Sequence, residues 1–383
     1  MGRDGEGIAA ALSRLLVAFT IELDNGFEQH MPHRTSFFGP GGPEPVLPSS
    51  GRPFRAPLLV SVAMWHNAMR YVPAAGVPRD DLVGLGANLT GLERWGYLRS
   101  EAPEAGASPV VKPTPAGRYA QVVWARMEDV VERRWEQRFG MDLLAALRAA
   151  LLGVTSHEGA PTPLYLPVVS HADGMRTRFR EPSAAQLAAA GLTKAEVAGL
   201  DTLLARGLLG FTLDFEAESR LSLPLTADVL ASLTDRSVAL RYVPMLAGVS
   251  KEGAQAGVGF LERHGLAITG ADPQTARGKA VSLTGEGRAA RDQYGRRLRA
   301  VEQGWEDRFG PDKVDGLRSV LAAFACHATG GEPTLALGLR PGPNGWRGRG
   351  RYRAQTKAVL ADPWRALPRH PMLLHRGGYP DGS

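Results

Sequence analysis

The fold is decided by residues 247–284, which read AGVSKEGAQAGVGFLERHGLAITGADPQTARGKAVSLT. Apolar side chains recur at steps of three and four between residues 251 and 264, and this spacing predicts a helix with one apolar face. Ser250, just before it, is a residue type that caps helix N-termini. The period then changes, and residues 266–269 and 279–283 read as two short strands joined by a turn. The stretch therefore predicts a helix followed by a hairpin.

Two further helical segments come before this stretch, at residues 227–233 and 237–247. Three helices followed by a two-stranded hairpin describe a winged helix-turn-helix unit. In such a unit the third helix is narrow enough to enter the major groove of DNA, and the hairpin lies over the neighbouring backbone or minor groove. The order of elements therefore indicates DNA binding.

The chain repeats this unit once, because three blocks of sequence return in the same order. The blocks are FTIE (19–22) with FTLD (211–214), LERWG (92–96) with LERHG (261–265), and WEQRFG (135–140) with WEDRFG (305–310). The first and second blocks lie further apart in the first copy, which requires about 22 extra residues there. Residues 38–57, with six prolines and four glycines between Gly39 and Pro57, supply them as a surface loop.

We expect four segments along the chain. The first unit covers residues 1–152 and carries the insertion at 38–57; a connector covers 153–192, the second unit covers 193–330, and a basic tail covers 331–383. Each unit opens with an amphipathic helix and has a long helix after its hairpin, and the apolar stripes of these helices need a partner. The predicted fold class is mainly α with small β-hairpin wings, in two tandem winged helix-turn-helix units.

The composition excludes several classes of protein. Of the 383 residues 44% are hydrophobic and 22% are charged, which is not the composition of a disordered or fibrous chain. The one cysteine, Cys326, excludes an internal disulfide framework, and we expect it in the core of the second unit's closing helix. Long apolar runs and a secretory signal are absent. We therefore expect a cytoplasmic, nucleoid-associated protein with no membrane partner.

The net charge of +6 is unevenly distributed. The tail at 331–383 holds nine basic and three acidic residues, whereas the chain from 1 to 330 carries equal numbers of the two kinds. A nucleic-acid surface on the body of the protein must therefore come from local clustering of basic groups and not from bulk charge.

Three segments of the second unit resemble MarR-type transcriptional regulators, namely AGVSK (247–251), LERHGL (261–266) and RGKAVSLT (277–284). Over nearly its full length the chain is similar to the tandem form of these proteins in actinobacteria, in the segments at 19–24, 31–35 and 371–378. The resemblance implies sequence-specific binding to double-stranded DNA, often controlled by a small-molecule effector, without a cofactor. Family members are homodimers with interlocking opening and closing helices. One chain here carries both sets, so we expect an intrachain pseudo-dimer, a monomer in solution, with a homodimer as the alternative.

The resemblance places the reading helix on residues 250–264 and the wing arginine on Arg277. Lys251 and Gln255 lie four residues apart, and such side chains can hydrogen-bond guanine and adenine edges; alternatively, they are the solvated face of a packed helix. The candidate DNA-binding residues are Ser250, Lys251, Gln255, Arg263, Arg277 and Lys279. Where the family has an acid two residues before the wing arginine, this chain has Thr275, and Asp272 is an imperfect substitute. Lys279 also fits a strand edge protected against aggregation.

The first unit departs further from the family pattern. It leaves room only for a short reading helix at residues 88–94, and its wing at 99–113 carries Glu101 and Glu104, with Ala107 in the place of Arg277. Acidic groups repel phosphates. We therefore expect a degenerate reader, kept for pairing, ligand sensing or loose backbone contact.

Other candidate sites are weaker. His30, His33, Trp65, Asn67 and Arg70 form a candidate effector pocket, with a core or interface role as the alternative. A metal site at the two histidines is disfavoured because a proline separates them and no third ligand follows. Catalytic motifs are absent, so we expect no enzyme. The alternatives are a glycosylase-like DNA-repair enzyme built from winged helices and a protein-interaction scaffold, which the neutral body favours.

Overall fold

The computed structural model describes residues 7–31, 33, 57–83, 85, 89–101, 108–155, 183–189, 191, 199–249, 251–275, 277–329 and 332–340. These residues are mainly helical, with small antiparallel sheets. We call residues 8–155 the first half and residues 200–326 the second half.

Both halves have nearly the same order of elements. The first half contains α1 (Ile8–His30), α2 (Val62–Met69), β1 (Val77–Pro78), η1 (Arg79–Leu82), α3 (Leu89–Trp95), β2 (Leu98–Glu101), β3 (Val110–Pro113), α4 (Pro115–Phe139) and α5 (Met141–Thr155). The second half contains α7 (Leu200–Ala217), α8 (Leu223–Ser232), β4 (Val238–Ala239), η2 (Leu240–Tyr242), α9 (Val243–Ala247), α10 (Lys251–Arg263), β5 (Ala267–Ala271), β6 (Lys279–Leu283), α11 (Gly285–Phe309) and α12 (Pro311–Cys326). Helix α6 (Ala184–Ala189) lies between them, and β7 (Ala328–Thr329), β8 (Glu332–Pro333) and η3 (Thr334–Leu339) follow.

Each half has one three-stranded antiparallel sheet, in the orders β1-β3-β2 and β4-β6-β5. In both, the last strand of the hairpin is the central one, and a two-residue strand from before the third helix pairs with its other edge. Val77 pairs with Val111 in the first sheet, and Val238 pairs with Val281 in the second. The sequence predicts only the two strands of the hairpin, because a two-residue strand has no detectable period.

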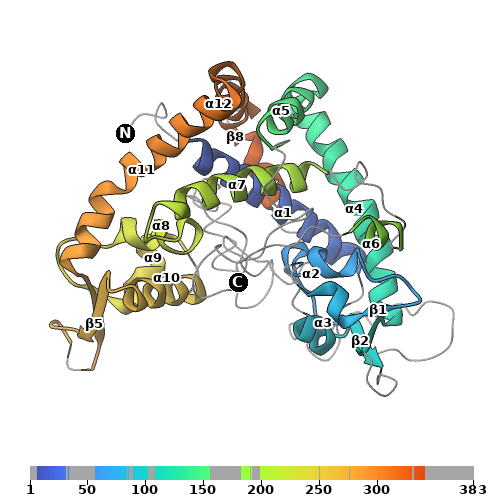
Figure 1. Cartoon of the computed structure of the whole chain (residues 1–383), viewed down its shortest axis with the longest axis horizontal. Coiled ribbons are helices and arrows are strands. Elements are labelled where there is room, and N and C mark those ends of the chain that lie inside the picture. Colours follow the sequence, from blue (N-terminus) through green and yellow to red (C-terminus); the bar gives the residue numbers. More distant parts are fainter. Residues whose placement is uncertain are drawn as a thin grey trace.

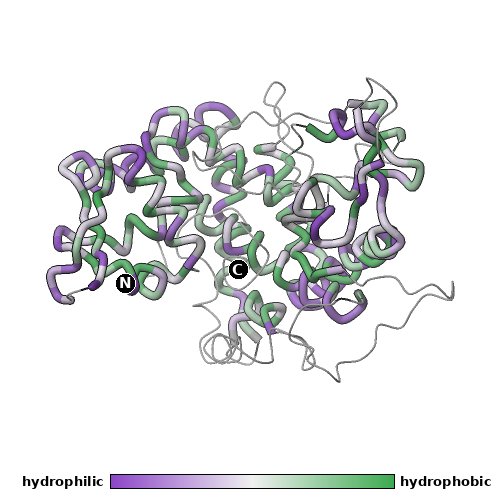
Figure 2. The backbone as a smooth tube through the Cα atoms, turned by 90° about the horizontal axis from the view of Figure 1, so that it is seen from below, coloured by the Kyte–Doolittle hydropathy of each residue, from purple (hydrophilic) through white to green (hydrophobic). Residues whose placement is uncertain are grey.

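The two halves meet along their opening and closing helices. In Figure 1, α1 and α7 cross the middle of the molecule, α5 and α12 lie together at the top, and α4 and α11 run down the two outer edges. Helices α8 to α10 with β5 occupy one lower corner, and α2, α3 and the first sheet occupy the other. Seen from below, hydrophobic positions concentrate on the inner helices, and hydrophilic stretches lie mostly at the outer edges (Figure 2).

The core between the halves contains two matching aromatic pairs. Phe19 of α1 meets Trp135 of α4 edge to face, with ring centroids 5.0 Å apart. Phe211 of α7 meets Trp305 of α11 in the same way, at 5.3 Å. Both phenylalanines are fully buried. Replacing either by alanine would therefore destabilise the fold by about 3–5 kcal/mol.

Each long helix also stabilises the N-terminus of the other half's opening helix. Glu302 Oε1 of α11 accepts a hydrogen bond from the Ile8 amide at 2.9 Å, and Glu132 Oε1 of α4 accepts one from the Leu200 amide at 3.1 Å. A carboxylate at a helix N-terminus satisfies an unpaired amide and opposes the positive end of the helix dipole. The preceding residue Gly7 has to be small, because a Cβ there would lie 2.8 Å from Glu302 Oε1.

Several predicted boundaries are wrong for identifiable reasons. Helix α8 begins at Leu223, four residues before the predicted start, because Pro224 favours the first turn of a helix. The segment predicted as one helix at 237–247 is β4, η2 and α9, since Val238 and Ala239 pair with the sheet and Pro244 begins a new helix.

The C-terminal segment at residues 332–340 belongs to the packed body and not to a separate tail, contrary to expectation. Leu335, Ala336 and Leu339 are buried, and η3 packs on α1. The side-chain amide of Asn25 donates to the carbonyl oxygens of Gly338 and Arg340, at 3.1 and 3.3 Å. We call residues 332–340 the C-terminal strap. The expectation of a core position for Cys326 is also wrong, because that residue is exposed at the end of α12.

Candidate nucleic-acid interface

Helix α10 presents one face to the protein and the other to solvent. Ala254, Val258 and Leu261 are buried against α8 and α9, as the periodicity predicts. Lys251 and Gln255 are exposed on the opposite face. Two donor-bearing side chains one helical turn apart therefore face outward near the N-terminus of α10, the end that reads bases in helix-turn-helix proteins.

A left-handed glycine sets the direction of α10. Gly248 ends α9 with φ 72°, and the amides of Gly248 and Val249 both donate to the Pro244 carbonyl, at 2.9 and 3.1 Å. This closing pattern satisfies the last carbonyl of α9 within a tight turn. The two helices are therefore joined by a short, hydrogen-bonded connection that fixes the outward face of α10.

Gly257 lowers the helix propensity of α10 but permits its close packing. A Cβ at this position would lie 2.5 Å from the Leu225 carbonyl oxygen and 2.7 Å from a methyl group of Val229, both on α8. The glycine therefore lets α10 approach α8 closely and offsets a propensity cost of about 1 kcal/mol.

The hairpin of the second half ends in a turn built around Asp272. The Asp272 amide donates to the Gly278 carbonyl at 2.8 Å, and its carboxylate accepts from the Gln274 amide and the Thr275 hydroxyl, both at 3.0 Å. Arg241 of η2 adds an ion pair at 3.1 Å. The Gln274 amide bond lowers the pKa of this carboxyl below its ordinary value, and Thr275 and Arg241 act in the same direction against burial. Asp272 therefore stays ionised and ties the turn to η2.

Asp272 does not contact the wing arginine for which it was expected to substitute. Its partner is Arg241, which also lies over the Tyr242 ring with 4.6 Å between the guanidinium carbon and the ring centroid. Arg277 is exposed in the turn, and Lys279 is exposed at the start of β6, paired in register with Ala271. Sequence reasoning missed Arg241, because its only signal was a buried acid in the turn that lacked a nearby base.

The remaining candidates for DNA contact are separated from this group or outside the description. Arg263 is exposed at the last turn of α10, about three helical turns from Lys251. Ser250 lies outside the described residues. The structure therefore places Lys251 and Gln255 together on one helix turn, and Arg277 and Lys279 on the neighbouring hairpin.

The corresponding surface of the first half is smaller and is neutralised internally. Helix α3 has seven residues and begins one residue after the predicted start. Its Glu93 pairs with Arg79 of η1 at 2.9 Å. In the hairpin, Glu101 pairs with Lys112 at 2.6 Å and Arg99 at 3.0 Å, and the Lys112 hydrogen bond lowers the pKa of Glu101. Glu104 and Ala107 lie outside the described residues. The charge of Glu101 is therefore compensated within the hairpin.

The candidate effector residues do not gather around one described cavity. Trp65 is buried with its ring 5.6 Å from that of Trp124, and Arg70 pairs with Glu128, so both make contacts with α4. His30 bonds through Nδ1 to the Gly26 carbonyl at 2.8 Å in its own helix. His33 is half-buried three residues further on, and the Asn67 side chain lies outside the description. These contacts fit the core or interface alternative for Trp65 and Arg70.

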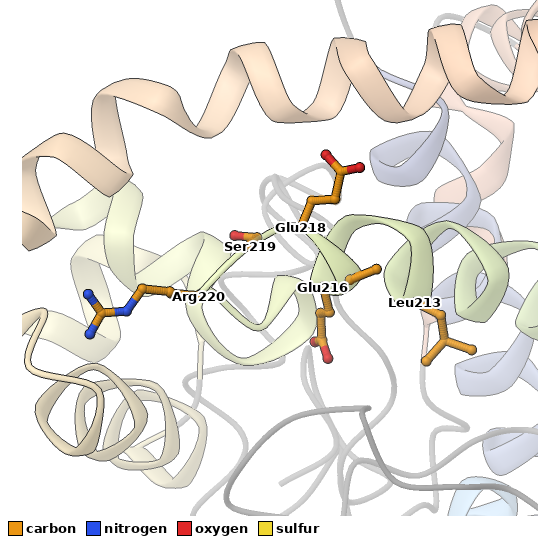
Figure 3. Close-up of a pocket in the computed structure, with 6 residues that line it drawn as sticks. Leu213, Glu216, Glu218, Ser219 and Arg220 are labelled. Atoms are coloured by element: carbon orange, nitrogen blue, oxygen red, sulfur yellow. The ribbon is translucent and has the colours of Figure 1, made fainter.

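The described part of the chain contains cavities in both halves. One of about 560 Å³ lies at the C-terminal end of α7 and is lined by Leu213, Glu216, Ala217, Glu218, Ser219 and Arg220. Figure 3 shows its charged side chains pointing in different directions, with Glu216 and Glu218 on opposite sides of the helix. Another, of about 320 Å³, lies between α1, α4 and the C-terminal strap.

Comparisons of the chain with protein-family models, with curated proteins and with solved structures found no match. Among the described residues, none of the helices is both long and apolar enough to cross a membrane. Within the same residues, histidine, cysteine and carboxylate side chains form no group of three or more that could hold a metal ion.

Proposed function

We propose that the chain is a MarR-type, DNA-binding transcriptional regulator in which two winged helix-turn-helix units of one chain form a pseudo-dimer. The second unit reads the major groove with α10 and contacts the backbone or minor groove with the β5–β6 hairpin. The observation that carries the proposal is the outward pair Lys251 and Gln255 at the N-terminal end of α10, beside a hairpin that exposes Arg277 and Lys279.

The chemistry of these groups supports readout of DNA. Glutamine can donate to and accept from adenine in the major groove, and lysine can donate to guanine. Arginine and lysine on the hairpin attract phosphate. The other half contributes a seven-residue helix and an internally neutralised hairpin, so sequence discrimination falls mainly on the second half.

Selection of binding sites from random duplex DNA with the full chain tests this function directly. We expect an enriched sequence, and we expect Lys251→Ala to weaken binding to it at least tenfold. Lys313→Ala is the matched control, because Lys313 is an exposed lysine on α12, which lies at the far end of the molecule from β5 (Figure 1).

The outcomes separate the three classes of function. An enriched site whose binding depends on Lys251 and not on Lys313 supports a regulator. DNA binding without any enriched sequence, together with strand cleavage at damaged bases, would support a repair enzyme. No salt-dependent DNA binding at all would contradict the proposal and favour a protein-interaction scaffold.

A further inference from the structure

The cavity between α1, α4 and the C-terminal strap collects more positive than negative charge. Its lining residues are Glu22, Asn25, Gly26, Gln29, Arg134, Gln137, Arg138, Leu337, Gly338 and Arg340. Three guanidinium groups thus share this space with one carboxylate, an excess of two positive charges. The volume of about 320 Å³ is at the lower end of the range for small-molecule sites.

The single carboxylate is already engaged by the protein. Glu22 is almost fully buried, and its oxygens accept from the Trp135 indole at 3.1 Å and from the Arg138 guanidinium. Arg134 is further from it, at 3.7 Å, and its side chain is 42% exposed. Glu22 therefore neutralises Arg138 first, and Arg134 and Arg340 account for the excess charge.

The strap forms one wall of the cavity and is fixed in place. Asn25 holds the carbonyl groups of Gly338 and Arg340, and a Cβ at Gly338 would collide with the Glu22 carboxylate. Only glycine lets the backbone pass so close to this side chain. Arg340 is therefore carried to the rim of the cavity by a rigid segment.

The second half provides an internal comparison. There Asp214 accepts from the Trp305 indole at 2.8 Å and pairs with Arg308 at 3.0 Å, so it repeats the arrangement of Glu22, Trp135 and Arg138. This shared arrangement serves the fold of both halves.

The additional polar groups do not recur in the second half. When Trp135 is aligned with Trp305, Arg134 corresponds to Gly304 and Gln137 to Asp307. When the FTIE block is aligned with FTLD, Gln29 corresponds to Leu221. The positive cavity is therefore a property of the first half alone, and packing of the repeated helices does not require it.

We propose that this cavity binds a small organic anion through a carboxylate or phosphate group held by Arg134 and Arg340. The planar guanidinium fork matches both groups. Gln29 and Gln137 line the same cavity and offer amide groups for the polar remainder of the ligand. This inference does not depend on DNA binding.

Calorimetric titration of the full chain in low salt tests the site with three probes. Succinate and inorganic phosphate represent the two anionic groups, and succinamide is the neutral analogue of succinate. We expect saturable binding of at least one anion and none of succinamide. Binding of one anion alone assigns the group that the site prefers, and binding of both supports the shared chemistry.

The variants locate the binding. Arg134→Gln and Arg340→Gln should each weaken anion binding at least tenfold, whereas Arg299→Gln, which removes an exposed arginine of α11, should leave it unchanged. Glutamine keeps the helix propensity at position 134, and equal melting temperatures of the three variants will show that the fold is intact. The proposal is overturned if neither anion binds, if succinamide binds equally, or if both cavity variants bind as the unaltered chain does.

Discussion

A buried carboxylate shapes the hairpin of the second half. Asp272 gathers the Gln274 amide, the Thr275 hydroxyl and the Arg241 guanidinium, and in doing so it fixes the turn that carries Arg277. The arginine itself is left exposed. Its backbone is thus positioned by hydrogen bonds while its side chain stays available to DNA.

Gln255→Ala should relax base preference at one position of the selected site. Removing a two-point contact to one base corresponds to about 1–3 kcal/mol of discrimination at that position. Arg277→Ala should instead weaken binding evenly across sequences, because a phosphate or minor-groove contact carries little base information. Competition binding against single-base variants of the site measures both effects. An unchanged base preference in Gln255→Ala would mean that this residue belongs to the solvated face.

Asp272→Asn should weaken DNA binding several-fold while keeping the preferred sequence. The neutral amide loses the charge-assisted bond to Arg241, so the turn that presents Arg277 is held less firmly. Asp312→Asn, an exposed acid on α12, is the matched control. Fluorescence anisotropy on the selected duplex would show the difference, and equal affinities for the two variants would rule out a positioning role for Asp272.

Among the elements, those with a long or strongly amphipathic pattern are predicted best. The sequence predicts α10 to within a residue at each end, because Ala254, Val258 and Leu261 recur on one face. It predicts the long helices α4 and α11 equally well, since each has a threonine N-cap. It misses β1 and β4, because these strands are set by pairing across the sheet and not by their own two residues.

The candidate site was predictable only in part. The exposed pair on α10 follows from local periodicity. The partner of Asp272 does not, because Arg241 is 31 residues away in the chain and its position depends on the fold of η2 against the hairpin. The cavity of the first half likewise joins Asn25 of α1 to Gly338 of the strap, 313 residues further along the chain. No local pattern could reveal either contact.

The packing of the strap divides the expected basic tail in two. Truncation after Arg340 removes only the segment beyond the strap, with seven arginines and one lysine. We expect this change to flatten the slope of log affinity against log salt by about 0.9 for each phosphate that the segment neutralises, with the preferred sequence retained. An unchanged slope would mean that this segment does not contact DNA.

Truncation after Gly330 should have a different effect. It also removes Leu335 and Leu339, which are buried and each contribute about 1.5–3 kcal/mol through that burial. We therefore expect a lower melting temperature than for the truncation after Arg340, measured by circular dichroism. Equal melting temperatures would contradict a structural role for the strap.

At the scale of the whole molecule, the two halves exchange contacts as the subunits of a dimer would. Glu302 of α11 binds the first amide of α1, and Glu132 of α4 binds the first amide of α7, and each acid is paired with an arginine of the following helix. Because both partners of each contact belong to one chain, their effective concentration exceeds what a second chain would supply. The repeated contacts are therefore satisfied within a single molecule.

We accordingly expect a monomer in solution that prefers an asymmetric DNA site. The second half presents a 13-residue helix and an exposed cationic hairpin, whereas the first half presents a seven-residue helix and a hairpin whose acid and bases pair with each other. One half of the site should thus be read strongly and the other weakly, unlike the palindromes bound by symmetric dimers. Light scattering at low micromolar concentration and the selected sequences test both parts. Glu132→Gln with Glu302→Gln should lower the melting temperature, by about 0.3–1 kcal/mol for each helix end, without creating a dimer. A stable dimer bound to a palindromic site would show that the halves pair between chains instead.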